Sequence, residues 1–264
     1  MYDEWVYFFT DIDTLDMRDK NQLADFVHSN HIGTILNCAA YTAVDKAEDD
    51  KINCMHINRD AVINMGEVAF SAGVKIIHVS TDYVFDGTGT RPYREDDTTN
   101  PTSFYGQSKL EGEQSLQKVC PDAAIIRTAW LYSEYGANFV KTMLRLGQAQ
   151  KTLKVVCDQI GSPTYAEDLA VAMMTMMNHQ SFVPGIYHFT NEGVCSWYDF
   201  AAKIMELAEL DCRVYPIQTS EYPTKAIRPA YSVLDKEKIK TTFHFSIPQW
   251  EKSLEKCINT LFGK

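Results

Sequence analysis

The stretch VKIIHVSTDYVFDG at residues 74–87 decides the fold class, because a mainly apolar run ends abruptly in three polar side chains. Apolar runs without polar alternation are typical of strands buried in a parallel sheet between two layers of helices. Ser80, Thr81 and Asp82 would then stand at the carboxyl end of such a strand, which is the edge where open α/β sheets bind ligands. We therefore expect a parallel sheet with a polar site at this edge.

Short apolar segments alternate with amphipathic ones along the first 145 residues. The segments that read as strands are 5–10, 34–40, 74–80 and 123–132, and those that read as helices include 59–73 and 103–119. Strands that alternate with helices in this way predict an α/β fold with a Rossmann-like, doubly wound and mostly parallel sheet.

The second half of the chain is less regular and predicts a smaller α/β part. We expect residues 1–145 to form a dinucleotide-binding domain and residues 146–264 to form a substrate-binding part. No flexible linker separates the two, so the second part should pack directly on the carboxyl edge of the first. A strand near 153–157 is expected to return to the main sheet.

The composition excludes several classes of function. The 264 residues carry a net charge of −10, which makes a nucleic acid or an anionic membrane a poor partner. The seven cysteines are odd in number and include no C-x-x-C pair, which predicts reduced thiols in a cytoplasmic protein and no metal site. No apolar stretch reaches the length of a membrane span, and residues 1–11 lack the basic segment that opens a signal peptide.

Tyr105 and Lys109 complete the predicted site. They are four residues apart and so share one face of the helix expected at 103–119. An ammonium beside a phenol favours the phenolate and lowers the pKa of the tyrosine, which would make Tyr105 a usable proton donor near neutral pH. The Thr81 hydroxyl can hydrogen-bond a substrate carbonyl. Together the three side chains suit hydride transfer to a ketone.

The motifs around these residues resemble one family. The sequences NCAAYTAVDKAE (37–48), STDYVFDGTGTRPYRE (80–95) and NPTSFYGQSKLEGE (100–113) carry the resemblance, and it continues in 126–146, 158–170, 193–201 and 228–239. The chain resembles the extended short-chain dehydrogenases/reductases, and within them the dTDP-4-dehydrorhamnose reductases. This resemblance implies NADPH or NADH as cofactor, a nucleotide sugar as substrate, and reduction of the 4-keto group of dTDP-4-dehydro-L-rhamnose to give dTDP-L-rhamnose.

The resemblance also implies roles for individual residues. Tyr105 would donate the proton, Lys109 would bind the cofactor ribose and lower the pKa of Tyr105, and Thr81 would orient the carbonyl. Asp82 would contact the sugar, and Trp130 would pack against its ring. The remaining residues implied in cofactor binding are Asp11 at the ribose end of the strand at 5–10, Asp16 and Met17 near adenine, and Ala39, Ala40, Tyr41 and Thr42 after the strand at 34–40.

One part of the family pattern is absent from this sequence. The family begins with a strand and a Gly-x-x-Gly-x-x-Gly turn, which binds pyrophosphate through backbone N–H groups at a helix N-terminus. The only Gly-x-Gly here is at 87–89, and 5–10 corresponds to the second strand of the family. We therefore expect a shortened version of a longer protein, in which 5–10 and 34–40 are displaced from the sheet and the cofactor binds weakly or not at all.

Other functions on the same scaffold stay open. The related 4,6-dehydratases carry Thr-Asp-Glu where this chain has Thr81, Asp82 and Tyr83, so the second acid needed to eliminate water is missing. Another nucleotide-sugar epimerase or reductase is an alternative. A non-catalytic regulatory protein is a second one, because a relative of the family serves as the regulatory subunit of methionine adenosyltransferase. The acids after residue 10 favour NADH over NADPH, since they would repel a 2′-phosphate, and a homodimer is left open.

Overall fold

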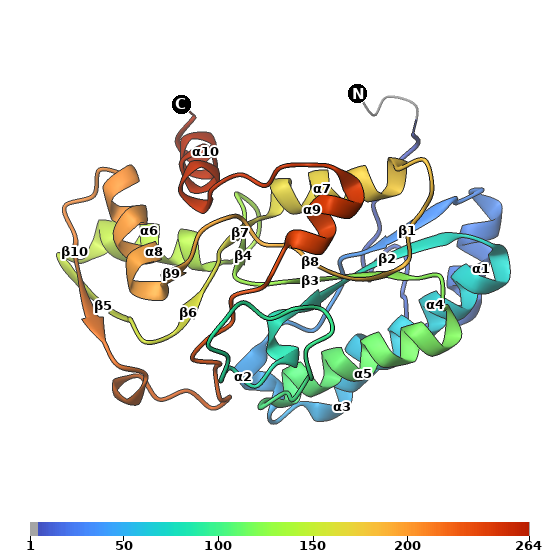
Figure 1. The fold of residues 1–264 in the computed structure, drawn as a ribbon, viewed down its shortest axis with the longest axis horizontal. Coiled ribbons are helices and arrows are strands. Elements are labelled where there is room, and N and C mark those ends of the chain that lie inside the picture. The colour runs from blue at the N-terminus through green and yellow to red at the C-terminus, as the bar shows by residue number, and fades with distance from the viewer. Residues whose placement is uncertain (1–4, 264) are drawn as a thin grey trace.

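The computed structural model describes residues 5–263 and has a four-stranded parallel sheet at its centre (Figure 1). The strands lie in the order β1-β2-β3-β8, which confirms the predicted α/β class with a parallel sheet. Their bounds are β1 (Thr34–Asn37), β2 (Lys75–Thr81), β3 (Ala124–Thr128) and β8 (Gly185–His188). The register places Asn37 beside His78, and it aligns Ser80, Arg127 and His188 in one row across three strands.

Helices cover both faces of this sheet (Figure 1). The helices α1 (Lys20–Ser29), α4 (Ala61–Ala72) and α5 (Phe104–Val119) pack on the face that carries Ile76 and Ile125. The helices α7 (Ala166–Asn178) and α9 (Glu237–Phe243) pack on the opposite face, around Ile77 and Ile126. Consecutive residues of a strand point to opposite faces, so apolar runs such as these can serve two cores at once.

Helix α5 approaches its neighbours unusually closely because two of its positions are glycine. A Cβ atom at Gly106 would lie 2.2 Å from the carbonyl oxygen of Tyr83, in the short 3₁₀ turn η2 (Asp82–Val84). A Cβ atom at Gly112 would lie 2.1 Å from the carbonyl oxygen of Asn58, in the π-helical turn η1 (His56–Asp60). The helical segments that precede η1 are α2 (Val44–Ala47) and α3 (Lys51–Met55).

The second half of the chain adds its own core, in which Phe200, Ile204 and Leu254 are fully buried. Its helices are α6 (Phe139–Ala149), α8 (Trp197–Leu207) and α10 (Trp250–Phe262), with a 3₁₀ turn η3 (Thr219–Glu221). Its paired strands are β5 (Thr152–Val156) with β10 (Arg213–Ile217), β4 (Leu131–Tyr132) with β7 (Thr164–Tyr165), and β6 (Ile160–Gly161) with β9 (Cys195–Ser196).

The expectation that a strand near 153–157 returns to the main sheet is wrong. Strand β5 pairs only with β10 among the described residues, and β8 instead occupies the place beside β3. The physical reason is visible in the burial of β5, where Thr152 and Lys154 are exposed while the residues between and after them are buried. A strand with one solvated face does not suit a sheet that helices cover on both sides.

Residues 5–10 do not form a strand, so that expectation is also wrong. Their side chains are exposed, and Phe9 is 92% exposed. The Trp5 indole donates a hydrogen bond to Asn178 Oδ1 at 2.8 Å, and the Phe8 ring meets Phe26 of α1 edge-on at 5.8 Å. In the structure no neighbouring strand pairs with this backbone, and an apolar composition does not make a strand without such a partner.

Strand β1, at the edge of the described sheet, stays in parallel register with β2 along its whole length. The expectation that 34–40 would be displaced from the sheet is therefore wrong, because the partner of this strand in the chain is β2 and not the segment at 5–10.

The division into parts at residue 145 stays a prediction. Strand β8 comes from beyond this residue but pairs with β3 in the main sheet, and helices α7 and α9 pack against a face of that sheet.

Across residues 5–263, no helix combines the length and apolar character that a membrane crossing requires. The same residues contain no group of three or more His, Cys, Asp or Glu side chains arranged to hold a metal ion.

Candidate active site

The polar run after β2 folds into a buried turn. Thr81 is 5% exposed, and its hydroxyl oxygen accepts a hydrogen bond from the Tyr83 backbone N–H at 3.2 Å. The same hydroxyl donates to Asp82 Oδ1 at 3.1 Å. Thr81 therefore caps η2, which is the local reason why a hydroxyl residue ends this strand. The turn holds Thr81 and Asp82 at the carboxyl edge of the sheet.

Helix α5 brings its functional side chains to the same place. It begins after Ser103, whose hydroxyl oxygen accepts a hydrogen bond from the Gly106 N–H at 3.2 Å. Tyr105, Lys109 and Glu113 follow at intervals of four residues and share the buried face of the helix. Lys109 and Glu113 are only 2% and 1% exposed, so this face carries charge into the interior.

Tyr105 and Thr81 lie within hydrogen-bonding contact of each other. Burial raises the pKa of Tyr105, the hydrogen bond with Thr81 lowers it in part, and the negative charge of Asp82 raises it further. The ring of Tyr83 packs edge-on against Tyr105, with centroids 5.6 Å apart. The net effect keeps the Tyr105 phenol protonated at neutral pH. The structure thus brings the predicted proton donor and the predicted carbonyl-orienting hydroxyl together.

Lys109 points away from this pair, toward the backbone of β2. Its Nζ donates a hydrogen bond to the Val79 carbonyl oxygen at 2.7 Å and lies 3.5 Å from His78 Nε2. Burial lowers the pKa of Lys109 to about 8, while the nearby Glu113 carboxylate acts to raise it. The expectation that Lys109 lowers the pKa of Tyr105 is wrong for this structure, because burial dominates the phenol and the ammonium bonds elsewhere.

Asp82 connects the two halves of the chain. Burial raises its pKa to about 6, and hydrogen bonds with Ser232 and Thr81 act in the opposite direction. Ser232 belongs to the segment that follows η3, and its backbone N–H donates to the Ile160 carbonyl oxygen at 2.8 Å. The second half of the chain therefore supplies one wall of the site around Asp82.

Trp130 belongs to that wall. It follows β3 with a φ of +50°, a conformation that bulky residues adopt only where the surroundings force it. Its indole stacks on Trp197 with centroids 3.6 Å apart and planes 12° apart. A Cβ atom at Gly161 would lie 2.7 Å from the Trp130 ring and 2.9 Å from Ser232 Oγ, so Gly161 lies against both side chains. Because Ser232 hydrogen-bonds Asp82, the Trp130 indole lies close to the Asp82 part of the site. Packing of Trp130 against a sugar stays a prediction.

The loop after β1 is fixed by two buried asparagines. Asn37 Oδ1 accepts a hydrogen bond from the Ala39 N–H at 3.0 Å, and Asn58 Oδ1 accepts one from the Tyr41 N–H at 2.9 Å. Asn58 Nδ2 also donates to the Tyr41 carbonyl oxygen at 3.1 Å. Ala39 and Thr42 are exposed in this loop, whereas Ala40 and Tyr41 are half-buried. The role of these four residues in cofactor binding stays a prediction.

Asp11, Asp16 and Met17 have structural partners of their own. Asp11 Oδ1 accepts hydrogen bonds from the backbone N–H groups of Asp13 and Thr14 within a surface turn. Asp16 forms an ion pair with Arg18 at 2.7 Å, and the hydrogen bond from that guanidinium lowers the pKa of Asp16. Met17 packs against the core beneath α1 and α4. No described contact joins these residues to Tyr105 or Thr81, and their adenine and ribose roles stay predictions.

Sequence reasoning missed several residues that the structure places at the site. His78 could have been found, because alternation along β2 puts it on the same face as Ser80. In the sequence Tyr83 is evident only as the residue that replaces an acid, whereas in the structure its ring packs on Tyr105. Nothing in the local sequence around Ser232 or Arg228 indicates that these residues lie at the site. The Arg228 guanidinium pairs with Asp45 at 2.7 Å and contacts the Tyr83 hydroxyl at 3.4 Å.

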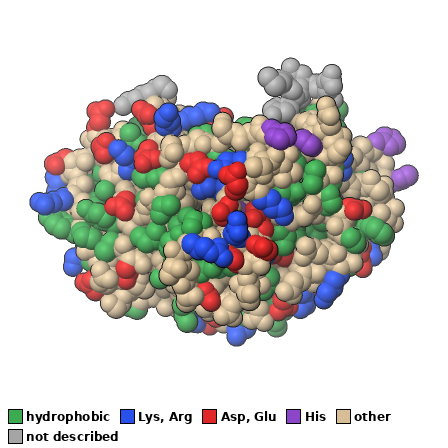
Figure 2. Space-filling view, in the orientation of Figure 1, with side chains coloured by type: hydrophobic (Ala, Val, Ile, Leu, Met, Phe, Trp, Pro, Cys, Tyr) green, Lys and Arg blue, Asp and Glu red, His purple; other side chains and the backbone are tan. Residues whose placement is uncertain are grey.

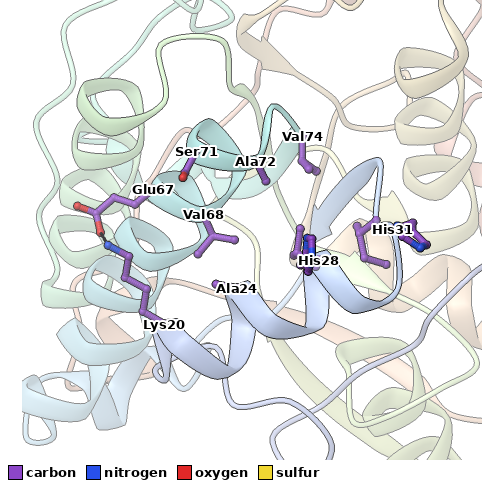
Figure 3. Close-up of a pocket in the computed structure, with 11 residues that line it drawn as sticks. Lys20, Ala24, His28, His31, Glu67, Val68, Ser71, Ala72 and Val74 are labelled. Atoms are coloured by element: carbon purple, nitrogen blue, oxygen red, sulfur yellow. Dashed lines mark ion pairs between the residues drawn. The ribbon is translucent and has the colours of Figure 1, made fainter.

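The surface features of the chain lie apart from this site. A groove of about 470 Å³ runs between α1 and α4, where Lys20 and Glu67 form an ion pair of 2.8 Å (Figure 3). None of the predicted site residues lines it. On the face shown in Figure 2, acidic and basic side chains are interspersed rather than gathered into one basic area.

The comparisons with known proteins decide the family. A family model described as the RmlD substrate binding domain matches residues 2–262. The chain belongs to this family. A dTDP-4-dehydrorhamnose reductase of Sinorhizobium fredii is 42% identical over 252 residues, which span 92% of this chain and 85% of that protein.

Solved structures of dTDP-4-dehydrorhamnose reductases agree in fold with this chain. A dTDP-4-dehydrorhamnose reductase of Clostridium acetobutylicum is 40% identical with a TM-score of 0.91, over 96% of this chain and 89% of that one. A dTDP-4-dehydrorhamnose reductase of Bacillus anthracis, solved in complex with NADP, is 38% identical with a TM-score of 0.94, over 98% of this chain and 91% of that one.

The buried carboxyl group of Asp82 predicts a pH-dependent stability. Its pKa is about 6 in the folded chain and about 4 when unfolded, so the folded chain binds more protons between these values. Stability contributed by this group is therefore full below pH ~4 and is lost as the pH rises through about 6. Because Asp82→Asn cannot titrate, its free energy of unfolding relative to the parent should rise by roughly 2–3 kcal/mol from pH 4 to pH 7.

Urea unfolding of both proteins across this pH range measures the effect of Asp82→Asn. The exposed Asp96 provides the matched control, and Asp96→Asn should show no such trend. A constant difference between Asp82→Asn and the parent at every pH would contradict the assignment of a raised pKa to Asp82.

Proposed function

We propose that this chain catalyses the NAD(P)H-dependent reduction of the 4-keto group of dTDP-4-dehydro-L-rhamnose to dTDP-L-rhamnose. The observation that carries the proposal is the contact between the Tyr105 phenol and the Thr81 hydroxyl at the carboxyl edge of the sheet. The similarity to the three dTDP-4-dehydrorhamnose reductases described above supports the same reaction.

The chemistry assigned to this chain is proton delivery to a developing oxyanion. The nicotinamide cofactor, when bound, supplies the hydride. The Thr81 hydroxyl can orient the substrate oxygen by donating to it in place of Asp82 Oδ1. The Tyr105 hydroxyl can transfer its proton to the same oxygen as negative charge develops. The raised pKa of Tyr105 does not prevent this step, because an alkoxide is more basic than a phenolate. It does keep the proton on Tyr105 until the substrate needs it.

The residues present fit one end of the cofactor. The Lys109 ammonium is buried and has one close acceptor, the Val79 carbonyl oxygen, so further N–H groups can bind ribose hydroxyls. Ala39 and Ala40 carry small side chains after β1 and permit a ligand to approach the backbone. Lys109, Tyr41 and Thr42 would hold the nicotinamide and its ribose. At the other end of the cofactor, the acids of the turn at 11–16 would repel a 2′-phosphate, so we expect a preference for NADH over NADPH.

The residues present do not fit the pyrophosphate. That group needs backbone N–H groups at a helix N-terminus, commonly in a glycine-rich turn. Gly87 and Gly89, the only Gly-x-Gly pair, pack instead against Pro229 and Tyr93, where a Cβ atom would lie within 2.6 Å and 2.8 Å of them. This mismatch leads us to expect impaired activity. A non-catalytic binding protein on the same scaffold is the second candidate function, and the presence of Thr81, Tyr105 and Lys109 argues against it.

Two further statements belong to the proposal. We place the protein in the cytoplasm, which the seven free cysteines support because reduced thiols are usual there. We also propose a homodimer, which light scattering on the purified chain can test.

Replacing Tyr105 should abolish most of the turnover. Tyr105→Phe removes the proton that the proposed mechanism transfers, so kcat should fall by roughly 10²–10⁴. The assay follows oxidation of NADH and of NADPH at millimolar concentration with dTDP-4-dehydro-L-rhamnose. Tyr135→Phe is the matched control, since Tyr135 is 83% exposed. Equal rates for Tyr105→Phe and the parent would overturn the reductase assignment.

Cofactor affinity separates the two candidate functions. Without a pyrophosphate cradle among residues 5–263, we expect dissociation constants for NADH and NADPH of roughly 1 mM or weaker. Isothermal titration calorimetry measures both. A micromolar dissociation constant for either cofactor would contradict the mismatch and the expectation of impaired activity.

A further inference from the structure

His78 is held in one tautomer by its neighbour on β1. The side chain is fully buried, and its Nδ1 lies 2.8 Å from Asn37 Nδ2. The orientation of the Asn37 amide is fixed, because its Oδ1 accepts the Ala39 N–H at 3.0 Å. An amide NH₂ group can only donate, so Nδ1 of His78 must accept. In a neutral imidazole the proton then resides on Nε2.

The Nε2–H of His78 faces the Lys109 side chain. The two nitrogens are 3.5 Å apart in the interior, and Lys109 Nζ is fixed there by its 2.7 Å hydrogen bond to the Val79 carbonyl oxygen. A protonated lysine offers only donors, so an ammonium at this position sets a donor against a donor. A neutral amine has a lone pair that can accept the Nε2–H and removes this conflict.

We propose that His78 is a positioning residue which, held as the Nε2–H tautomer by Asn37, favours the neutral amine of Lys109 and so sets the pH at which the lysine becomes charged. The proposal depends on the reductase function only for its consequence, which is control over the charge beside the cofactor ribose. Asn37, His78 and Lys109 lie in one buried row from β1 through β2 to α5.

The other groups around Lys109 do not oppose this role. Glu113 of α5 acts to raise the pKa of Lys109, yet burial prevails and lowers it to about 8. The thiols of Cys38 and Cys54 also lie near Lys109, and burial raises the pKa of each thiol, so both are uncharged at neutral pH. The Glu113 carboxylate is itself engaged by Arg127 through hydrogen bonds of 2.7 Å and 3.0 Å. Burial, and to a smaller extent the charge of Lys109, holds the pKa of His78 well below its ordinary value, so the imidazole is neutral. His78 therefore acts on Lys109 through the dipole of its ring and not through a charge.

The tautomer can be measured on the unsubstituted protein. Histidine labelled with ¹⁵N gives distinct chemical shifts for protonated and unprotonated ring nitrogens, and His78→Gln identifies the signals of His78. We expect a protonated Nε2 and an unprotonated Nδ1 at neutral pH. A protonated Nδ1, or a charged ring, would overturn the proposal.

Asn37→Asp reverses the predicted tautomer. The new carboxylate still accepts the Ala39 N–H and now accepts Nδ1–H of His78, which leaves an Nε2 lone pair to accept from the Lys109 ammonium. The pKa of Lys109 should therefore rise by about one pH unit or more. An NMR titration of ¹³Cε-labelled lysine in the protein without cofactor measures this pKa, with Lys109→Met to assign the signal.

The double variant Asn37→Asp/His78→Phe separates the tautomer from the added negative charge. It keeps the carboxylate but removes the imidazole, so the rise should be clearly smaller than in Asn37→Asp alone. An equal rise in both variants, or none in Asn37→Asp, would overturn the proposal. These readouts need no turnover, so they can fail while the reductase assignment holds, and Tyr105→Phe can fail while they succeed.

Discussion

The close packing of α5 on the carboxyl half of β2 is the interaction on which the rest of the structure depends. It buries a lysine, a glutamate and an arginine, and burying each charge without a partner costs several kcal/mol. The interface avoids that cost by pairing Glu113 with Arg127 and by bonding Lys109 to the Val79 carbonyl oxygen. Gly106 and Gly112 allow α5 to lie equally close to η2 and η1, because a side chain at either position would meet the carbonyl oxygen of Tyr83 or of Asn58. The same contact brings Tyr105 to Thr81.

Much of this arrangement could be predicted from local sequence. The apolar run before Ser80 predicted a buried parallel strand, and the four-residue spacing of Tyr105 and Lys109 predicted a shared helix face; both are confirmed. Burial was harder to predict. A lysine near a tyrosine was expected to lower the pKa of the phenol, but the sequence does not show that the ammonium bonds to a strand carbonyl while the phenol is desolvated.

The failures of prediction share one cause, which is dependence on distant partners. Residues 5–10 have strand-forming composition, but no strand lies beside them in the part of the chain that the structure describes. Strand β5 pairs with β10, which lies more than fifty residues further along the chain. Ser232 and Trp197 reach the site only because the second half folds against the first. Periodicity reports which face of an element is buried, and it cannot report which other element covers that face.

The central claim is that burial, and not a neighbouring cation, governs the Tyr105 phenol. Ultraviolet difference titration of the free protein against Tyr105→Phe isolates this tyrosine among the fourteen in the chain. The account predicts no ionisation assignable to Tyr105 at the ordinary phenol pKa of about 10, nor up to about pH 11. Ionisation of Tyr105 below pH ~11 would contradict it, and ionisation below pH ~9 would restore the lysine as the group that sets the acidity of the proton donor.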